Sequence, residues 1–358
     1  GPGGGSFNEN AAGTYFNNSL TITDADSADF DGGVLTTTIT AAGESTDRLL
    51  VRDGNNVSIS GSNVEYDFGG GPIVIGSFTG GDGTDPLVIT FTSSSTAVSV
   101  EAVAQQVAFR SVSENPSTAQ RSLSMSVTDG DGGTSATANR VMNVVAHNDA
   151  PTLDNSGSPT DPTITEDNVN NTGMTVADLL LTGAGGDPIA DVDGDPEGIA
   201  STLRNTGRGV WQYSIDSGTN WSNVGTVSES SALLLRSTDL VRFNPDGQNG
   251  ITQTFDFRAW DQSLGTEGTN VDTTTNGGTT AFSTDIDTAT ITVSPVNDSP
   301  TVATNTGATV LEGGSVTIDA TTLNEGDVDD AGTGLTYTVT CGPSILLLDL
   351  TSNPGVAI

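Results

Sequence analysis

An eight-residue phrase that occurs twice limits what this chain can fold into more than any other feature. The sequence reads AHNDAPTL at 146–153 and PVNDSPTV at 295–302, so Asn-Asp, a small residue, Pro, Thr and an aliphatic residue return after 149 residues. A segment typical of a β-strand precedes each copy. Repetition of this kind indicates a tandem array, and 358 residues suffice for two to three domains, so we expect similar domains in series.

Alternation of apolar and polar residues predicts β-strands along most of the chain. Two stretches, SVEAVAQQVAF at 99–109 and TVADLLL at 175–181, have apolar spacing that instead favours short helices. Gly, Asp and Asn cluster between the strand segments as turn formers, and many short strands divided by turns are typical of β-sandwiches. The predicted fold class is therefore all-β. The clearest strand segments are LVITFT, RSLSMSVTDG, TFDFRAW, TATITVSP and GLTYTVT.

The repeated phrase divides the chain into three units, 1–148, 149–297 and 298–358. The first two units have the length of complete sandwiches, whereas the third has only about 60 residues and is expected to be a partial one. Each unit opens with a Glu and continues with an Asp-x-Asp pair, namely Glu9 with Asp24 and Asp26, Glu166 with Asp191 and Asp193, and Glu312 with Asp327 and Asp329.

The composition excludes several classes of function. The chain carries 45 acidic and 10 basic residues, a net charge of −35, so nucleic acids and anionic membranes are unfavourable partners. With one cysteine (Cys341) and one histidine (His147), no intrachain disulfide and no Cys/His zinc site can form, and the chain has no Lys for Schiff-base chemistry. No apolar run reaches the ~18 residues that would cross a membrane, so no membrane insertion is expected. We therefore predict that the protein is not an enzyme.

The acidic residues around the first repeated phrase suit a calcium site. Ca²⁺ takes six to eight oxygen ligands from carboxylates, carbonyls and Asn side chains. One reading treats the acidic residues as solvated surface charge, but their order along the chain favours a cation site between consecutive units. The ligands would be Asn148 and Asp149 in the linker, Asp191 and Asp193 on a loop of the next unit, and Asp129 and Asp131 on a loop of the preceding unit.

In their order along the chain, these motifs resemble the cadherin-like repeats of large bacterial surface adhesins. The resemblance covers residues 7–300 and rests on TITDADSADF, VTDGDGGTS, FRAWDQ and VNDSPT. It implies tandem immunoglobulin/cadherin-like sandwiches, Ca²⁺ held at the junctions by the linker Asn-Asp and the following Asp-x-Asp, and an extracellular location on a bacterial cell surface. The full set of expected ligands is Glu9, Asp24, Asp26, Asp129, Asp131, Asn148, Asp149, Glu166, Asp191, Asp193, Asp261, Asn297, Asp298, Glu312, Asp327 and Asp329.

The short third unit ends in SILLLDL and PGVAI, which are strongly apolar. Either the parent chain continues beyond residue 358, or strands from another copy complete the sandwich by β-strand addition and build a homopolymer. The predicted function is a structural subunit of a bacterial adhesin stalk or extracellular filament, stiffened by Ca²⁺ at its junctions. The alternative is a calcium-dependent module that binds a surface glycan or another cell.

Overall fold

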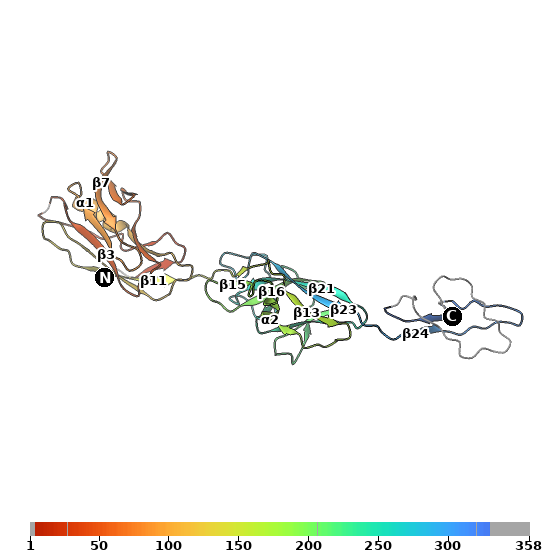
Figure 1. Cartoon of the computed structure of the whole chain (residues 1–358). Helices are drawn as coiled ribbons and strands as arrows, with labels where there is room; N and C mark the ends of the chain where they lie inside the picture. The colour runs from red at the N-terminus through yellow and green to blue at the C-terminus, as the bar shows by residue number, and fades with distance from the viewer. Residues whose placement is uncertain (1–3, 27, 206, 320, 330–358) are drawn as a thin grey trace. The chain divides into compact units, whose positions relative to one another are not determined.

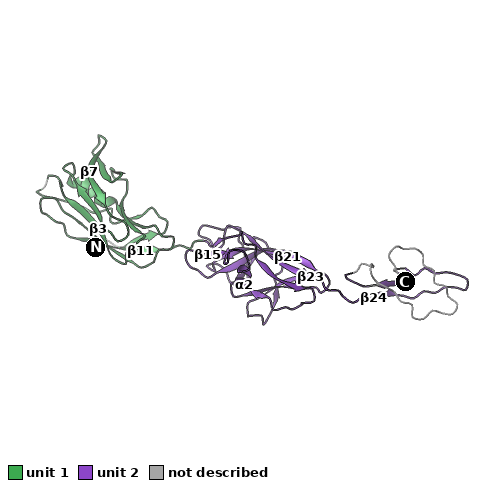
Figure 2. Cartoon of the chain, in the orientation of Figure 1, with its two compact units in different colours: residues 1–149 green, residues 150–358 purple. Residues whose placement is uncertain are grey.

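The computed structural model describes residues 4–26, 28–205, 207–319 and 321–329. The chain forms two compact units, Gly1–Asp149 and Ala150–Ile358 (Figures 1 and 2). The described residues are almost entirely β-strand and turn, with the short helices α1 (Ala97–Gln106) and α2 (Val176–Leu180) where the apolar spacing predicted helices. Helix α1 ends earlier than that spacing suggested, because Val107 already begins a strand. The predicted all-β sandwich fold is confirmed.

Unit 1 contains a large sheet with strand order β1-β11-β10-β3-β8-β7-β6-β5 and a small sheet with order β2-β9-β4. The first strand pairs with the last in parallel, and the other pairings are antiparallel. The strands are β1 (Gly5–Asn8), β2 (Thr14–Tyr15), β3 (Val34–Ala41), β4 (Asp47–Val51), β5 (Val57–Ser60), β6 (Asn63–Asp67), β7 (Pro72–Thr79), β8 (Leu87–Phe91), β9 (Val107–Ser111), β10 (Arg121–Val127) and β11 (Ala138–Val145).

The core of unit 1 lies between its two sheets. Strand β8 buries Leu87, Ile89 and Phe91 on one face, as the alternation of its sequence predicted. Phe7 of the large sheet meets Phe109 of the small sheet edge to face, with ring centroids 5.6 Å apart. Aromatic pairs in this arrangement contribute stability beyond the area they bury, and this pair holds the short strand β1 against the core.

Unit 2 repeats the two-sheet arrangement with strand orders β13-β23-β21-β16-β19-β22 and β14-β20-β17-β18, and β13 pairs with β23 in parallel. Two further pairs, β12-β15 and β24-β25, are two-stranded. The strands are β12 (Thr152–Leu153), β13 (Thr160–Thr165), β14 (Met174–Thr175), β15 (Ile189–Ala190), β16 (Gly198–Arg204), β17 (Gly209–Ser214), β18 (Ser222–Asn223), β19 (Ala232–Arg236), β20 (Leu240–Pro245), β21 (Ile251–Trp260), β22 (Asn270–Val271), β23 (Asp287–Ser294), β24 (Val302–Asn305) and β25 (Leu323–Glu325).

Aromatic residues join the two sheets of unit 2. Trp211 of β17 lies 5.4 Å from Phe243 of β20 and 5.5 Å from Phe255 of β21, measured between ring centroids. Trp260 is buried, and its Nε1 donates to the carbonyl of Leu264 at 2.8 Å. None of the described helices is long and apolar enough to cross a membrane.

Two expectations concern residues that the structure does not describe. The predicted strand GLTYTVT and the apolar segment 344–358 both lie outside the described ranges. The boundary between the second and third predicted units, near residue 297, stays a prediction. Completion of the third unit by strands of another copy also stays a prediction.

A buried ion pair ties the sheets of unit 1 together. Arg121, the first residue of β10, is fully buried and donates to Asp47 of β4 at 2.9 Å and to Glu44 at 2.8 Å. Its remaining N–H groups reach the carbonyls of Ser117 and Ala119. The guanidinium therefore compensates the buried Asp47 charge and also closes the 117–121 loop.

Replacing this arginine should destabilise unit 1 severely. Arg121→Met leaves the Asp47 carboxylate buried without its cation, so we expect the free energy of unfolding to fall by about 3–5 kcal/mol. Asp82→Asn breaks the exposed Arg48–Asp82 pair, in which the Asp82 side chain is 83% exposed, and should cost less than ~1 kcal/mol. Urea denaturation measures both, and equal losses in the two variants would contradict this ranking.

A buried carboxyl in β13 should make the stability of unit 2 depend on pH. Burial raises the pKa of Asp161 from 3.8 to about 6. The folded state thus binds more protons than the unfolded state between these pH values, and stability falls as the pH rises through this window. Asp161→Asn should therefore raise the free energy of unfolding at pH 8 by up to about 3 kcal/mol, and by much less near pH 4. Urea denaturation at the two pH values tests this, with the exposed Asp285→Asn as the control that should change neither.

Candidate metal centre

A buried glutamate follows the first strand of the large sheet in unit 2. Because β13 runs parallel to β23, Glu166 lies beside the end of the last strand, and its backbone N–H donates to the carbonyl of Ser294 at 3.1 Å. Its side chain is completely buried, and Oε1 accepts the N–H of Val296 at 2.8 Å. The parallel pairing thus places a carboxylate at the start of the linker segment that follows the sheet.

Unit 1 repeats this arrangement with different residues. The backbone N–H of Glu9, just after β1, donates to the carbonyl of Val145 at 2.9 Å, and its buried carboxylate accepts the N–H of His147 at 2.7 Å. In the repeat alignment, His147 corresponds to Val296. Only the backbone of His147 takes part in this contact.

The linker asparagines fix the backbone of the aspartates that follow them. Asn148 donates from its side-chain amide to the carbonyl of Asp149 at 3.2 Å, and Asn297 donates to the carbonyl of Asp298 at 2.9 Å. The same contact in both copies explains why Asn-Asp recurs as a pair. The asparagine orients the peptide from which the aspartate side chain projects.

Each Asp-x-Asp pair forms the same local turn. The first carboxylate accepts the backbone N–H of the second aspartate, at 3.1 Å for Asp24, 2.8 Å for Asp191 and 2.9 Å for Asp327. Aspartate favours turns for this reason, since its short side chain can bond to backbone two residues ahead. The turn holds the second aspartate in a fixed direction without any ion.

Three carboxylates meet beyond the end of the large sheet in unit 2. Glu166, Asp298 and Asp329 each offer an oxygen within 4.8 Å of the others. The backbone N–H of Asp298 donates to Asp329 Oδ2 at 2.6 Å. Among the described residues, the buried Oε2 of Glu166 has no hydrogen-bond partner. Burial and the neighbouring charges of Asp329, Asp167 and Asp327 raise the pKa of Asp298.

A second group of carboxylates lies on the loop that follows β15. Asp191, Asp193 and Asp195 satisfy the same 4.8 Å criterion, and Asp191 Oδ2 is buried without a hydrogen-bond partner among the described residues. Asp261 is close enough to act on this group electrostatically. Burial, followed by the charges of Asp191, Asp261 and Asp193, raises the pKa of Asp195.

The structure brings together part of the predicted ligand set. A third group, in unit 1, joins Glu9 and Asp149 with Glu114, which no sequence motif marked as a ligand. Asp195 was not predicted as a ligand either, although it continues the alternating aspartates of ADVDGD. Glu114 has no counterpart in the other units that could have marked it as a ligand. Among the described residues, the predicted ligands that do not join a group of three acidic side chains are Asp24, Asp26, Asp129, Asp131, Asp261, Glu312 and Asp327.

One of these predicted ligands has an evident local role. Asp129 Oδ1 accepts the backbone N–H groups of Asp131, Gly132 and Gly133 at 2.9–3.0 Å. Its carboxylate therefore closes its own turn. The prediction that Asp129 and Asp131 ligate an ion remains untested.

Glu166, Asp298 and Asp329 together form what we call the Glu166 group, and its chemistry fits a hard divalent cation. All its side-chain donors are carboxylate oxygens, which suit Ca²⁺ or Mg²⁺ and do not suit metals that prefer sulfur or imidazole. A buried carboxylate oxygen without a hydrogen bond is costly unless a cation or a proton compensates it. These two features together make the group a candidate cation site.

Comparisons with known proteins find similarity only among solved structures. No protein-family model matches it, and no curated protein matches it. Solved structures similar to it include mouse protocadherin-24 EC1-3, with 11% identity over 81% of this chain and 68% of that chain at a TM-score of 0.26. Chicken VE-cadherin EC1-2 matches with 12% identity over 81% of this chain and 96% of that chain at a TM-score of 0.24.

A bacterial structure matches with a similarly low sequence identity and TM-score. CfaE, the adhesive subunit of the CFA/I fimbria of enterotoxigenic Escherichia coli, matches with 8% identity over 82% of this chain and 99% of that chain at a TM-score of 0.25. With TM-scores this low, the sandwich fold rests on the sheets of the chain itself.

Removing one charge from the Glu166 group should change the titration of its neighbour. In chelator-treated protein, Asp329→Asn should lower the pKa of Asp298 toward its ordinary value, because a facing negative charge disappears while the substituted amide oxygen can still accept the Asp298 N–H. Carboxyl ¹³C NMR titration measures the shift. Asp319→Asn, which removes a charge from another exposed turn, is the control. An unchanged Asp298 pKa in Asp329→Asn would show that the carboxylates do not interact.

Proposed function

We propose that this chain is a structural segment of an extracellular adhesion protein, and that Ca²⁺ bound to its acidic groups stiffens it. The observation that carries the proposal is the buried Glu166 carboxylate, whose Oε2 lacks a hydrogen-bond partner among the described residues. One oxygen of this carboxylate lies within 4.8 Å of an oxygen of Asp298 and of Asp329. Isolated buried charges are strongly unfavourable in proteins, and a nearby cation removes the penalty. The site therefore has a physical need for a positive ion.

Calcium is the cation that suits these residues best. Ca²⁺ accepts six to eight oxygens in flexible geometry, so carboxylates, linker carbonyls and water can share its coordination. Mg²⁺ requires a nearly ideal octahedron and gives up its water reluctantly. Three carboxylates from distant parts of the sequence, Glu166, Asp298 and Asp329, would be joined through one ion.

The internal repeat extends the proposal to the first repeated phrase. Glu9 and Asp149 correspond to Glu166 and Asp298, and Asp193 occupies the sequence position of Asp329. On the basis of that alignment we assign the same role to Glu9 and Asp149 in unit 1, while Asp193 belongs to the separate acidic group of unit 2. Glu114, which lies near Glu9 and Asp149, would add a further carboxylate.

The chemistry of the site supports an extracellular setting. A weak oxygen-only calcium site works where Ca²⁺ is abundant, as it is outside cells, where modules of this kind bind at about 10⁻⁴–10⁻³ M. We place the protein on a bacterial cell surface as part of an adhesin stalk or filament. Its growth by strand addition would involve residues 344–358, which lie outside the described ranges.

Calcium should raise the melting temperature of unit 2 through Glu166. At a Ca²⁺ concentration about ten times Kd, mass action stabilises the folded state by ~1.4 kcal/mol, which corresponds to roughly 3–6 °C for a domain of this size. Glu166→Gln should reduce the calcium-dependent rise by that amount. In EDTA the same variant should melt no lower than the wild type, since it removes a buried charge. Scanning calorimetry with and without Ca²⁺ measures both effects.

The control is Asp285→Asn, which removes an exposed charge outside the acidic groups and should respond to Ca²⁺ like the wild type. A loss of stability in Glu166→Gln that is equal in EDTA and in Ca²⁺ would mean that Glu166 has only a packing role. If the melting temperature of the wild type does not change with Ca²⁺, the acidic groups are only surface charge and the proposal is wrong.

A further inference from the structure

A large aromatic side chain is exposed at the tip of the β6–β7 hairpin in unit 1. Phe68 is 48% exposed, although most phenylalanines of the chain are buried in the cores. It lies in the turn between Asp67 and Pro72, far in sequence from the acidic groups described above. Exposed apolar side chains that gather at one place mark a candidate contact surface, and Val98 lines the same hollow as Phe68.

The surrounding residues hold Phe68 in a defined position. Its ring meets the ring of Tyr66 edge to face, with centroids 4.7 Å apart. Asp67 Oδ1 accepts the backbone N–H groups of Gly69 and Gly71 at 2.6 and 3.0 Å. Both glycines have positive φ, 102° and 108°, which other residues adopt only with strain. The turn is therefore built to keep the aromatic ring rigid and outward.

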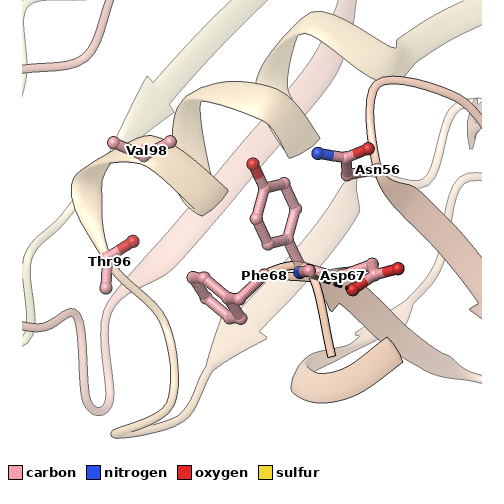
Figure 3. Close-up of a pocket in the computed structure, with 7 residues that line it drawn as sticks. Asn56, Asp67, Phe68, Thr96 and Val98 are labelled. Atoms are coloured by element: carbon pink, nitrogen blue, oxygen red, sulfur yellow. Dashed lines mark hydrogen bonds between the residues drawn. The ribbon is translucent and has the colours of Figure 1, made fainter. Parts of the chain in front are cut away.

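An open hollow of about 610 Å³ borders this ring (Figure 3). Phe68 and Asp67 lie on one side of it, while Thr96 and Val98, at the start of α1, lie on another. Val98 is 67% exposed and adds a second apolar surface. The volume falls within the range of roughly 300–1,000 Å³ that is common for small-ligand sites.

The Asn56 side chain also lines the hollow, and its backbone is well fixed. Its carbonyl accepts the N–H of Asp67 at 2.9 Å. The preceding residue, Asn55, donates from its side chain to Gln105 of α1 at 3.0 Å. Asn55 and Asn56 both have positive φ, which is characteristic of a type I′ hairpin turn. An amide with one donor and one acceptor group thus lines the same hollow as the Phe68 ring.

These features combine an apolar platform with a polar rim. A pyranose ring has a C–H face that can lie against an aromatic side chain and hydroxyl groups at its edge that donate and accept hydrogen bonds. Phe68 supplies the platform, and the Asn56 amide and Asp67 carboxylate supply polar partners for hydroxyl groups. We infer that the hollow between the β6–β7 turn and α1 binds a neutral oligosaccharide.

The negative charge of the protein argues against anionic ligands, and the bonds already made by Asp67 argue against a cation. Hydrogen bonds from Gly69 and Gly71 lower the pKa of Asp67, so its carboxylate is ionised at neutral pH and, together with the net charge of −35, repels sialylated or sulfated glycans. A cation would be attracted, but the Asp67 oxygen that bonds both glycines already has its charge partly satisfied within the turn. A neutral ligand rich in hydroxyl groups is the better match.

Saturation-transfer NMR on the full chain tests this inference. The probes are neutral oligosaccharides of glucose, galactose and mannose, with sialyllactose, a heparin oligosaccharide and choline for comparison. At least one neutral probe should bind, and Phe68→Ala should weaken it about tenfold or more. Asn56→Gly removes the amide, tolerates the positive φ, and should weaken binding about two- to tenfold.

The controls keep the outcome separate from folding and from calcium. Phe68→Tyr retains the ring and should bind, and Val112→Ala, which alters another exposed apolar residue of unit 1, should bind like the wild type. The lining residues include none of the proposed calcium ligands, so EDTA should leave binding unchanged. The inference is wrong if no neutral probe binds, if the anionic probes or choline bind in its place, or if Phe68→Ala binds as well as the wild type.

Discussion

The parallel pairing between the first and last strands of the large sheet governs both units. In unit 1 it joins β1 to β11, and in unit 2 it joins β13 to β23. The strand that enters the sandwich therefore ends beside the strand that leaves it, and the glutamate that follows the first strand meets the backbone just beyond the last. An antiparallel partner would carry that glutamate to the opposite end of the sheet. The acidic groups that include Glu9 and Glu166 exist because of this strand direction.

A carboxylate held in this way connects packing with electrostatics. Glu166 is fully buried, and one of its oxygens accepts a backbone N–H while the other has no hydrogen-bond partner among the described residues. Such a group opposes folding when it is charged and alone, and favours folding when a cation is present. The free energy that it contributes thus depends on the solution around the protein. Arg121 in unit 1 differs in this respect, because its partner Asp47 belongs to the fold itself.

Much of the fold could be predicted because its signals are local. Alternation in LVITFT and RSLSMSVTDG matched β8 and β10, and apolar spacing located both helices. The repeated Asn-Asp and Asp-x-Asp motifs marked residues that do form the same turns and linker contacts. Glu114 and Phe68 could not be found in this way. Their positions depend on which distant segments fold beside them, and Phe68 follows a strand in which apolar residues are normally expected to be buried.

The direction of the paired strands also determines how each sandwich would respond to a pulling force. The chain enters unit 1 at the start of β1 and leaves at the end of β11, and these two strands are parallel and hydrogen bonded along Gly5–Asn8. Tension applied through the two ends would act along the strands in opposite directions, so the hydrogen bonds between them would be sheared together instead of opening one after another. The same geometry holds for β13 and β23. Resistance to extension is thus a property of the topology, present in each sandwich before any ion binds.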